Sequence, residues 1–363
     1  MARSHAVLWL LSGLFCASLA NAQTGAESVP DQDGTYIKGL ISALQEDDSY
    51  KIRLQAAVFL GRSNDPRAVE PLLGVLTKDK HYTVRAAAAT ALANLDEPKA
   101  IEPIIVLAAA DPDEFVREEA QRALDTYDRA TVMRQVVATY RHYIDGAAKD
   151  TVTAVAVRRT VIDYLMSGDF TAGEPVFTEA LGDVPDIFAE VRKVVLLQPE
   201  AVQLRFLQAS VDHSEPSVRR GAVEVLRSVG TKHATEIILQ VYDRELEVDQ
   251  VRKATYTALR ELRRFLPLDT IADSALKNAD RYARARSIKL LGVIGGDEAK
   301  QVLLKNLQAD EPYFRGTAVN ALKTLGDPST IPALEALLTE PANERLKLQI
   351  HSTIKELRGG GAP

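Results

Sequence analysis

Three ten-residue stretches decide the fold: KIRLQAAVFL at 51–60, TVRAAAATAL at 83–92 and FVREEAQRAL at 115–124. Each has an arginine in third place and a leucine in last place, and Arg53, Arg85 and Arg117 are evenly spaced. Because seven residues make two turns of an α-helix, the arginine and the leucine fall on the same helix face. An interval of about 20–50 residues indicates a repeat architecture, and the interval here suits units made of a pair of short helices.

The same pattern returns in the second half of the chain, where the interval between successive arginines varies by only one position from unit to unit. Lys347 continues the register in place of an arginine. The arginines that share this place are named the repeat arginines: Arg53, Arg85, Arg117, Arg219, Arg252, Arg284 and Arg315.

A turn and a second helix follow several of these segments. NDP at 64–66, DEP at 96–98 and GDP at 326–328 combine turn residues with a proline that suits the first turn of a helix. Two short helices cannot bury their apolar faces alone, whereas stacked pairs gain about 1.5–3 kcal/mol for each large apolar side chain. The expected fold is therefore all-α, a right-handed α-α superhelix (solenoid) of about nine to ten helical hairpins.

The frames with an aspartate six places before the arginine carry a family resemblance: Asp47 to Arg53, Asp79 to Arg85, and Asp111 to Arg117. With the Ala-rich helix and the Pro turn, they resemble the HEAT-repeat superfamily, especially the short repeats first described in phycobilin lyases. The resemblance covers most of residues 35–357 and is specific for architecture rather than function. It implies a solenoid whose concave face, lined by second helices, is the expected binding surface.

The middle of the chain departs from the repeat. After Arg117 the next frame, at Arg158, comes later than the repeat interval predicts, and a further frame puts Pro199 in its apolar position. We therefore expect a signal peptide at 1–22, a flexible lead-in at 23–34, regular repeats with an N-terminal cap helix at 35–124, irregular helical repeats at 125–210, regular repeats at 211–357 and a disordered tail at 358–363.

The segment 1–22 reads as a secretory signal peptide. Arg3 gives a positive start, an apolar run follows at 6–15, and the small residues at 20–22 suit a signal peptidase. Cleavage is expected before Gln23, with export to the periplasm, and no later apolar run has the about 20 residues of a membrane-spanning helix.

Cys16 is the only cysteine, and it falls within the expected signal peptide. A lipoprotein would acylate this residue, but the bulky Phe15 before it disfavours that alternative. After cleavage the chain would have no thiol for a disulfide or a thiolate metal site. The 44 basic and 50 acidic residues give a net charge of −6, which disfavours nucleic acid as a partner.

The sequence lacks the patterns of common catalytic sites. It has no HExxH, GxSxG, P-loop or dinucleotide-binding glycine pattern. No histidine is followed by glutamate, so the di-iron chemistry of the HEAT-repeat enzyme deoxyhypusine hydroxylase is not implied. We expect no catalytic residue, no cofactor and no metal, and hence a protein that is not an enzyme.

The repeat arginines have two interpretations. They could form an anion-binding row, or each could pair with the aspartate that opens its helix or with the loop of the neighbouring repeat. The second, structural interpretation is the expected one.

The stretch 252–289 holds ten basic residues against four acidic ones, a local charge of +6 on an acidic chain. It could bind an acidic partner, a lipid headgroup or an anionic envelope polymer, or it could be a solvated face. Its candidate binding residues are Arg260, Arg263, Arg264, Arg281 and Arg286.

Two further groups are candidate binding residues. Tyr127, Tyr140 and Tyr143 cluster in the irregular middle, where they could form an interface or fill gaps in the packing. An acidic row could run along the second helices, at one fixed offset from the repeat arginines, or be a solvated stripe: Glu70, Glu102 and Glu236.

These observations predict an exported, non-catalytic scaffold or adaptor that binds other proteins of the cell envelope through the solenoid surface. The first alternative is a module that binds an envelope polymer or lipid through residues 252–289. The second, disfavoured alternative is an enzyme of the HEAT-like lyase or hydroxylase type.

Overall fold

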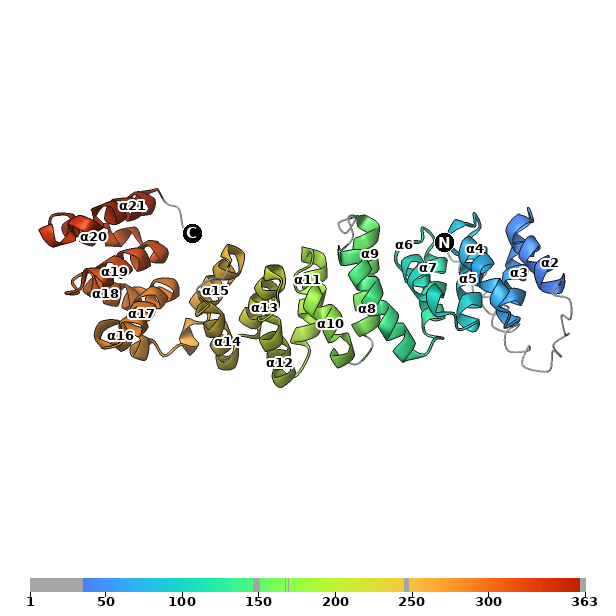
Figure 1. The fold of residues 1–363 in the computed structure, drawn as a ribbon, viewed down its shortest axis with the longest axis horizontal. Coiled ribbons are helices and arrows are strands. Elements are labelled where there is room, and N and C mark those ends of the chain that lie inside the picture. Colours follow the sequence, from blue (N-terminus) through green and yellow to red (C-terminus); the bar gives the residue numbers. More distant parts are fainter. Residues whose placement is uncertain (1–34, 146–150, 167, 169, 245–247, 360–363) are drawn as a thin grey trace, which may run out of the picture. The chain divides into compact units, whose positions relative to one another are not determined.

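The structure, a computed structural model, describes residues 35–145, 151–166, 168, 170–244 and 248–359. This part of the chain consists of α-helices and short 3-10 helices, with no β-strand, so the prediction of an all-α fold is confirmed (Figure 1). The chain divides into two compact units, residues 1–135 and 136–363. The expected signal peptide and lead-in lie outside the described residues.

Unit 1 stacks its helices in two layers. One layer holds first helices, with α3 against α5 and α5 against α7, and the other has α2 against α4 and α4 against α6. The predicted cap helix is α2, which takes the place of a second helix and buries Ile37 and Leu44. The helices are α2 (Thr35–Glu46), α3 (Tyr50–Arg62), α4 (Val69–Lys78), α5 (Tyr82–Asn94), α6 (Ile101–Ala110) and α7 (Glu114–Leu124), and α8 (Arg129–Asp145) contains the boundary between the units.

Unit 2 continues the same principle. Its odd-numbered helices from α9 to α21 each pack on the next, and in the other layer α12 packs on α14 and α16 on α18. The helices are α9 (Val152–Met166), α10 (Phe170–Ala180), α11 (Pro185–Leu196), α12 (Glu200–Ser210), α13 (Pro216–Val229), α14 (Lys232–Tyr242), α15 (Asp249–Glu261), α16 (Leu268–Lys277), α17 (Arg281–Ile294), α18 (Asp297–Asn306), α19 (Pro312–Leu325), α20 (Ile331–Leu338) and α21 (Lys347–Arg358).

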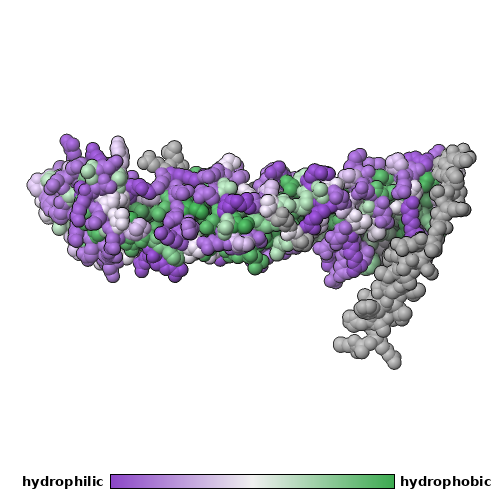
Figure 2. Space-filling model, turned by 90° about the horizontal axis from the view of Figure 1, so that it is seen from below, coloured by the Kyte–Doolittle hydropathy of each residue, from purple (hydrophilic) through white to green (hydrophobic). Residues whose placement is uncertain are grey.

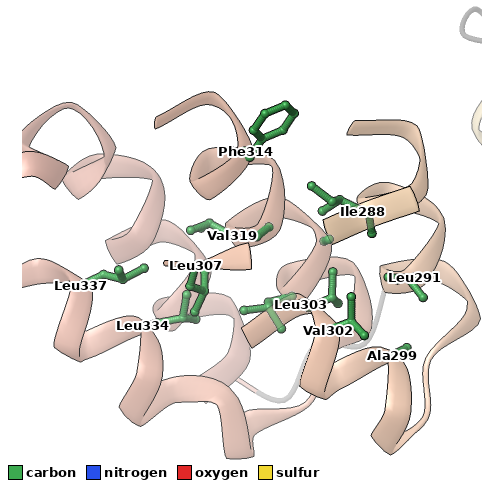
Figure 3. Close-up of a cluster of buried hydrophobic side chains, with 14 of the residues drawn as sticks. Ile288, Leu291, Ala299, Val302, Leu303, Leu307, Phe314, Val319, Leu334 and Leu337 are labelled. Carbon is green, nitrogen blue, oxygen red and sulfur yellow. The ribbon is translucent and has the colours of Figure 1, made fainter. Parts of the chain in front are cut away.

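The residue seven places after each repeat arginine is a core residue, as the helical spacing predicts. Near the C-terminal end of unit 2 these residues join a cluster that α17 to α21 share, in which Leu303, Leu307 and Leu334 lie close together (Figure 3). The core residues at this place in the repeat are Leu60, Leu92, Leu124, Leu226, Leu259, Leu291, Leu322 and Ile354.

The Pro turns have one common geometry. Asn64, Asp96 and Gly326 adopt φ of 49°, 51° and 74°, the left-handed region that Asn, Asp and Gly tolerate best. An acidic residue follows and caps a 3-10 helix that begins with proline: η2 (Pro66–Ala68), η3 (Pro98–Ala100) and η5 (Pro328–Thr330). The turn residues in the sequence therefore predicted both the break between helices and the start of the next.

The stretch predicted to be irregular has unequal helices. α8 has 17 residues and α9 has 15, against 10 in α4 and α6, and Pro175 lies inside α10. Pro199 is the N-cap of α12, so the apolar position of that sequence frame falls beyond the end of α11, although α11 packs on α9 and α13. Of the predicted tail, Arg358 ends α21. None of the described helices is long and apolar enough to cross a bilayer.

Glycines make some of these stacks possible, and Gly61 offers a test. A Cβ on Gly61 of α3 would lie 2.6 Å from the Cα and Cβ of Ala91 on α5. We expect Gly61→Ala to destabilise the protein by about 1–3 kcal/mol, because α3 and α5 would have to move apart. Thermal and urea unfolding would measure this change.

Gly74→Ala is the matched control. Gly74 lies in α4 with nothing within 4 Å of its would-be Cβ. Because alanine favours a helix interior over glycine by about 1 kcal/mol, this variant should be more stable than the parent. If both variants unfolded alike, the close approach of α3 and α5 would be wrong.

Candidate functional site

A chain of buried ion pairs connects the repeats of unit 1. Arg85 donates from Nε to Asp111 Oδ2 and from Nη2 to Asp111 Oδ1, both at 2.8 Å, and from Nη1 to the carbonyl oxygen of Asp79 at 2.9 Å. Arg53 binds the Asp79 carboxylate at 2.7 and 2.9 Å and the carbonyl oxygen of Asp47 at 2.9 Å. Each aspartate thus accepts from two repeats at once. This set is named the arginine ladder: Arg53, Asp79, Arg85, Asp111 and Arg117, which donates to the Asp111 carbonyl at 2.7 Å.

The structural interpretation therefore holds for Arg53 and Arg85, which pair with the aspartate of the neighbouring repeat and also donate to the carbonyl oxygen of the aspartate in their own frame. Asp79 and Asp111, which the sequence placed at the opening of these helices, are not their N-caps. Asp79 Oδ1 accepts from the backbone N–H of His81, two residues on, at 2.8 Å, and His81 is itself the N-cap of α5. Asp111 does the same for Asp113, the N-cap of α7, at 2.9 Å. The aspartates shape the loops and leave the capping to the residue two places later.

The ladder shifts the ionisation of its members. Burial by itself would raise the pKa of Asp79, but the hydrogen bonds from Arg53 and from the His81 N–H outweigh it and place the pKa below its ordinary value. The hydrogen bond to Asp111 raises the pKa of Arg85. Both groups are therefore held in their charged forms.

Unit 2 contains a more deeply buried relative of this pair. Arg158 is 1% exposed; its Nε lies 2.8 Å from Asp183 Oδ2, and its Nη1 donates to the Tyr143 carbonyl at 2.5 Å. The hydroxyl of Tyr140 donates to Asp183 Oδ2 at 2.6 Å. Sequence reasoning noted the Arg158 frame but not its importance. The sequence signal for this pair was an aspartate, Asp183, 25 residues after Arg158. This spacing is close to the 26 residues between Arg53 and Asp79.

The repeat arginines of unit 2 have more varied contacts than those of the ladder. Arg219 donates to the His213 carbonyl at 2.8 Å and Arg315 to the Ala309 carbonyl at 2.7 Å. Arg284 donates to the Ala275 carbonyl at 3.1 Å, and its guanidinium lies 4.1 Å from the centre of the Phe314 ring. Arg252 is exposed and pairs with Asp249 in its own helix, so its assignment to a structural row is corrected.

The tyrosines proposed as an interface are placed differently. Tyr127 is 6% exposed and its hydroxyl donates to the Glu97 carbonyl at 3.1 Å, while Tyr140 is fully buried. Burial raises the pKa of both phenols. Tyr127 and Tyr140 therefore fill the core, which corrects the interface alternative for them. Tyr143 is half-buried beside His142.

The basic stretch 252–289 is partly neutralised in the folded protein. Arg286 Nε donates to Asp243 at 2.6 Å and Arg281 lies 3.7 Å from Glu311, and both carboxylates are outside the stretch that gave the local charge of +6. Arg260 donates to the carbonyls of Val293 and Thr324 at 2.8 and 2.7 Å. Arg260 thus binds the main chain of two later helices, which corrects its assignment as a binding residue.

Two candidate residues from different groups line one cavity. Glu236 of α14 and Arg264 of η4 (Arg263–Phe265) border a cavity of about 410 Å³. Arg263 is exposed next to it and does not line it. Glu70 on α4 and Glu102 on α6 lie on second helices of unit 1, exposed and half-buried respectively.

Sequence reasoning missed a row of aromatic side chains in unit 1, named the aromatic edge: Tyr50, His81, Tyr82 and Phe115. The rings of Tyr50 and His81 are stacked with centroids 3.7 Å apart, His81 and Tyr82 follow at 4.9 Å, and Tyr82 meets Phe115 edge-on at 6.0 Å. Tyr50, Tyr82 and Phe115 remain 37–41% exposed. Their place two or three residues before a repeat arginine was a signal in the sequence.

The described residues offer no group of three or more His, Cys, Asp or Glu side chains that could hold a metal ion.

The ladder pair Arg85–Asp111 gives a direct test. We expect Arg85→Ala to lower the free energy of unfolding by about 3 kcal/mol, because it leaves the Asp111 carboxylate buried without its partner. Arg122→Ala, which removes an exposed cation paired with Glu118 and Glu119, should cost under about 1 kcal/mol. Urea unfolding of both variants measures the difference, and equal losses would contradict a stabilising ladder.

The lowered pKa of Asp79 predicts acid sensitivity. The ordinary pKa of this carboxyl group is 3.8, and its pKa in the folded protein is lower. The stability that the Asp79 carboxylate contributes to the fold is therefore complete above pH 3.8 and is lost as the pH falls through the folded pKa. The stability of Asp79→Asn should therefore fall less steeply than that of the parent between about pH 5 and pH 2. Asp48→Asn, which changes an exposed carboxylate of the preceding loop, should keep the steeper profile of the parent.

Comparison with known proteins adds to this geometry. Phycocyanobilin lyase subunit alpha from Picosynechococcus is 42% identical over 55 residues, which is 15% of this chain and 20% of that protein. Human deoxyhypusine hydroxylase with glycerol aligns over 80% of this chain and 84% of that chain, at 18% identity and a TM-score of 0.24. The CpcE–CpcF complex of phycocyanin lyase from Nostoc aligns over 92% and 98%, at 19% identity and a TM-score of 0.26.

A family model described as HEAT repeats matches residues 37–125 and 268–354. The first match coincides with the first segment predicted to be regular, and the second lies within the other. In both, the structure has paired helices in two layers and a buried apolar residue seven places after the repeat arginine. Residues 37–125 and 268–354 of this chain therefore resemble HEAT repeats in sequence and are built as stacked helical pairs.

Proposed function

We propose that the protein is an exported, non-catalytic scaffold that binds other proteins of the cell envelope, and that the aromatic edge of unit 1 is its main contact surface. The observation that carries this proposal is the exposure of three large rings in one continuous row across α3, α5 and α7. Tyrosine and other aromatic residues are enriched at binding hot spots.

The contacts beneath the aromatic edge hold its rings in place, which favours binding of a partner. His81 stacks on Tyr50 while its backbone N–H is held by Asp79, which Arg53 holds in turn. The rings are thus attached to a loop that a buried ion pair fixes. A surface ordered before binding loses less conformational entropy when a partner arrives, so a larger part of the contact energy becomes affinity.

The chemistry around the rings indicates the kind of partner. Asp48 and Glu114 are exposed next to Tyr50 and Phe115 in the sequence, and Lys51 and Lys80 are exposed near them. A mixed polar rim around aromatic rings is the usual composition of a protein–protein contact. This composition favours a folded protein or peptide over an anionic polymer.

Two other functions remain as alternatives. Binding of an envelope polymer or lipid through residues 252–289 is weakened by the ion pairs that neutralise Arg281 and Arg286. A role like that of a phycobilin lyase subunit is suggested by the similar segment of 55 residues. That match is short, and the predicted export signal sits poorly with an intracellular target.

The test is affinity purification of the tagged protein from its own cell envelope at moderate salt, with mass spectrometry of the eluate. We expect a chain that begins at Gln23 together with one or two stoichiometric proteins. The variant Tyr50→Ala/Tyr82→Ala/Phe115→Ala should reduce the partner's affinity at least about thirtyfold, since a single hot spot contributes about 2 kcal/mol.

The control changes apolar residues elsewhere that are even more exposed than the rings of the aromatic edge. Leu197→Ala/Tyr282→Ala replaces side chains of unit 2 that are 78% and 83% exposed, and it should retain the partner. Circular dichroism and thermal unfolding establish that both variants are folded. Retention of the partner by the edge variant would refute the proposed surface. A lone protein that carries a chromophore or metal would favour the enzyme alternative.

A further inference from the structure

In the layer of second helices in unit 2, close packing is interrupted between α14 and α16, as it is between α10 and α12 and between α18 and α20. α12 packs on α14 and α16 packs on α18, whereas contacts between α14 and α16 are sparse. The chain between α15 and α16 does not turn directly into the next helix, because η4 and Pro267 intervene. The side of α14 that a regular repeat would cover is therefore left open.

The cavity of about 410 Å³ lies at this interruption. Leu239 from α14 and Phe265, Leu266 and Pro267 from the connecting segment supply its apolar wall. Hydrophobic surface gathers over the part of unit 2 that contains α14 in the view of Figure 2. The volume of the cavity falls within the range of small-molecule sites, which are mostly apolar with a few polar groups.

Charged side chains border the apolar wall. Lys232 and Arg264 are both exposed, and no carboxylate among the described residues pairs with either one. The guanidinium of Arg264 lies 4.7 Å from the centre of the Phe265 ring, so the cation is held against the wall. Glu236, one helical turn after Lys232, is the single acidic side chain of the lining. The lining thus carries two cations and one anion.

We propose that this cavity binds the anion of a short fatty acid. The acyl chain lies on Leu239, Phe265 and Leu266, and the carboxylate lies between Lys232 and Arg264. The apolar wall accounts for the chain, and the two cations, which pair with no carboxylate in the described part of the chain, account for the headgroup. Glu236 weakens this attraction. The site is independent of the aromatic edge, so the two proposals can fail separately.

Titration calorimetry of the purified protein with octanoate tests the site, with 1-octanol and octylamine as probes of equal chain length. Octanoate should bind more tightly than either. Arg264→Gln should weaken octanoate about tenfold, as expected for loss of a charge-assisted hydrogen bond. Glu236→Gln should strengthen octanoate binding, because it removes a repelling charge at the site.

Arg263→Gln is the matched control, since Arg263 is the exposed neighbour that does not line the cavity. It removes the same charge and should leave octanoate affinity unchanged. Binding of 1-octanol as tight as that of octanoate, tighter binding of octylamine, equal losses in Arg263→Gln and Arg264→Gln, or no saturable heat with octanoate would each overturn the proposal. Because none of these variants touches Tyr50, Tyr82 or Phe115, partner capture by the aromatic edge is a separate result.

Discussion

The bidentate pair between an arginine of one repeat and an aspartate of the next is the interaction on which unit 1 depends. Arg85 and Asp111 are 10% and 3% exposed, so neither charge could be left there alone without a large desolvation cost. The geometry satisfies both charges with two hydrogen bonds and adds a third to the Asp79 carbonyl. Apolar stacking supplies most of the stability of such a fold, but it tolerates sliding. The ladder fixes the register between successive hairpins.

The ion pairs of the arginine ladder also affect the positions of exposed side chains. The aspartate that accepts from the preceding repeat also orients the backbone of the next N-cap, as Asp79 does for His81. The N-cap carries a ring of the aromatic edge, so a buried ionic contact determines where exposed rings lie. Where the pair is missing, the consequences differ. Among the described residues Arg252 pairs with Asp249 of its own helix and with no carboxylate of a later repeat.

Binding sites in a repeat protein are expected where particular side chains are added to the surface of the repeat or where the regular stacking is interrupted, because the stacked core is the same in every unit. Both surfaces fit this expectation. The aromatic edge lies on the surface of a regular region, and the cavity between α14 and the η4 segment lies where α14 and α16 are not closely packed. The first presents rings outward to a macromolecule, and the second encloses a volume suited to a small amphiphile.

The sequence by itself determined the helical repeat, its register and its core. Leu60 and Leu92 are buried as their spacing predicted, and Asn64 and Asp96 occupy the left-handed turn positions that their types suggested. These features are local, since helix periodicity and turn chemistry act over a few residues. Only the tertiary structure decided which charges are free. Local counting gave residues 252–289 a charge of +6, yet Asp243 and Glu311 arrive from other helices to pair with Arg286 and Arg281. Tyr140 is likewise a core residue, and its buried hydroxyl donates a hydrogen bond to Asp183, 43 residues away in the sequence. Pairing and burial depend on distances across the fold, and those distances are set by stacking rather than by neighbours in the chain.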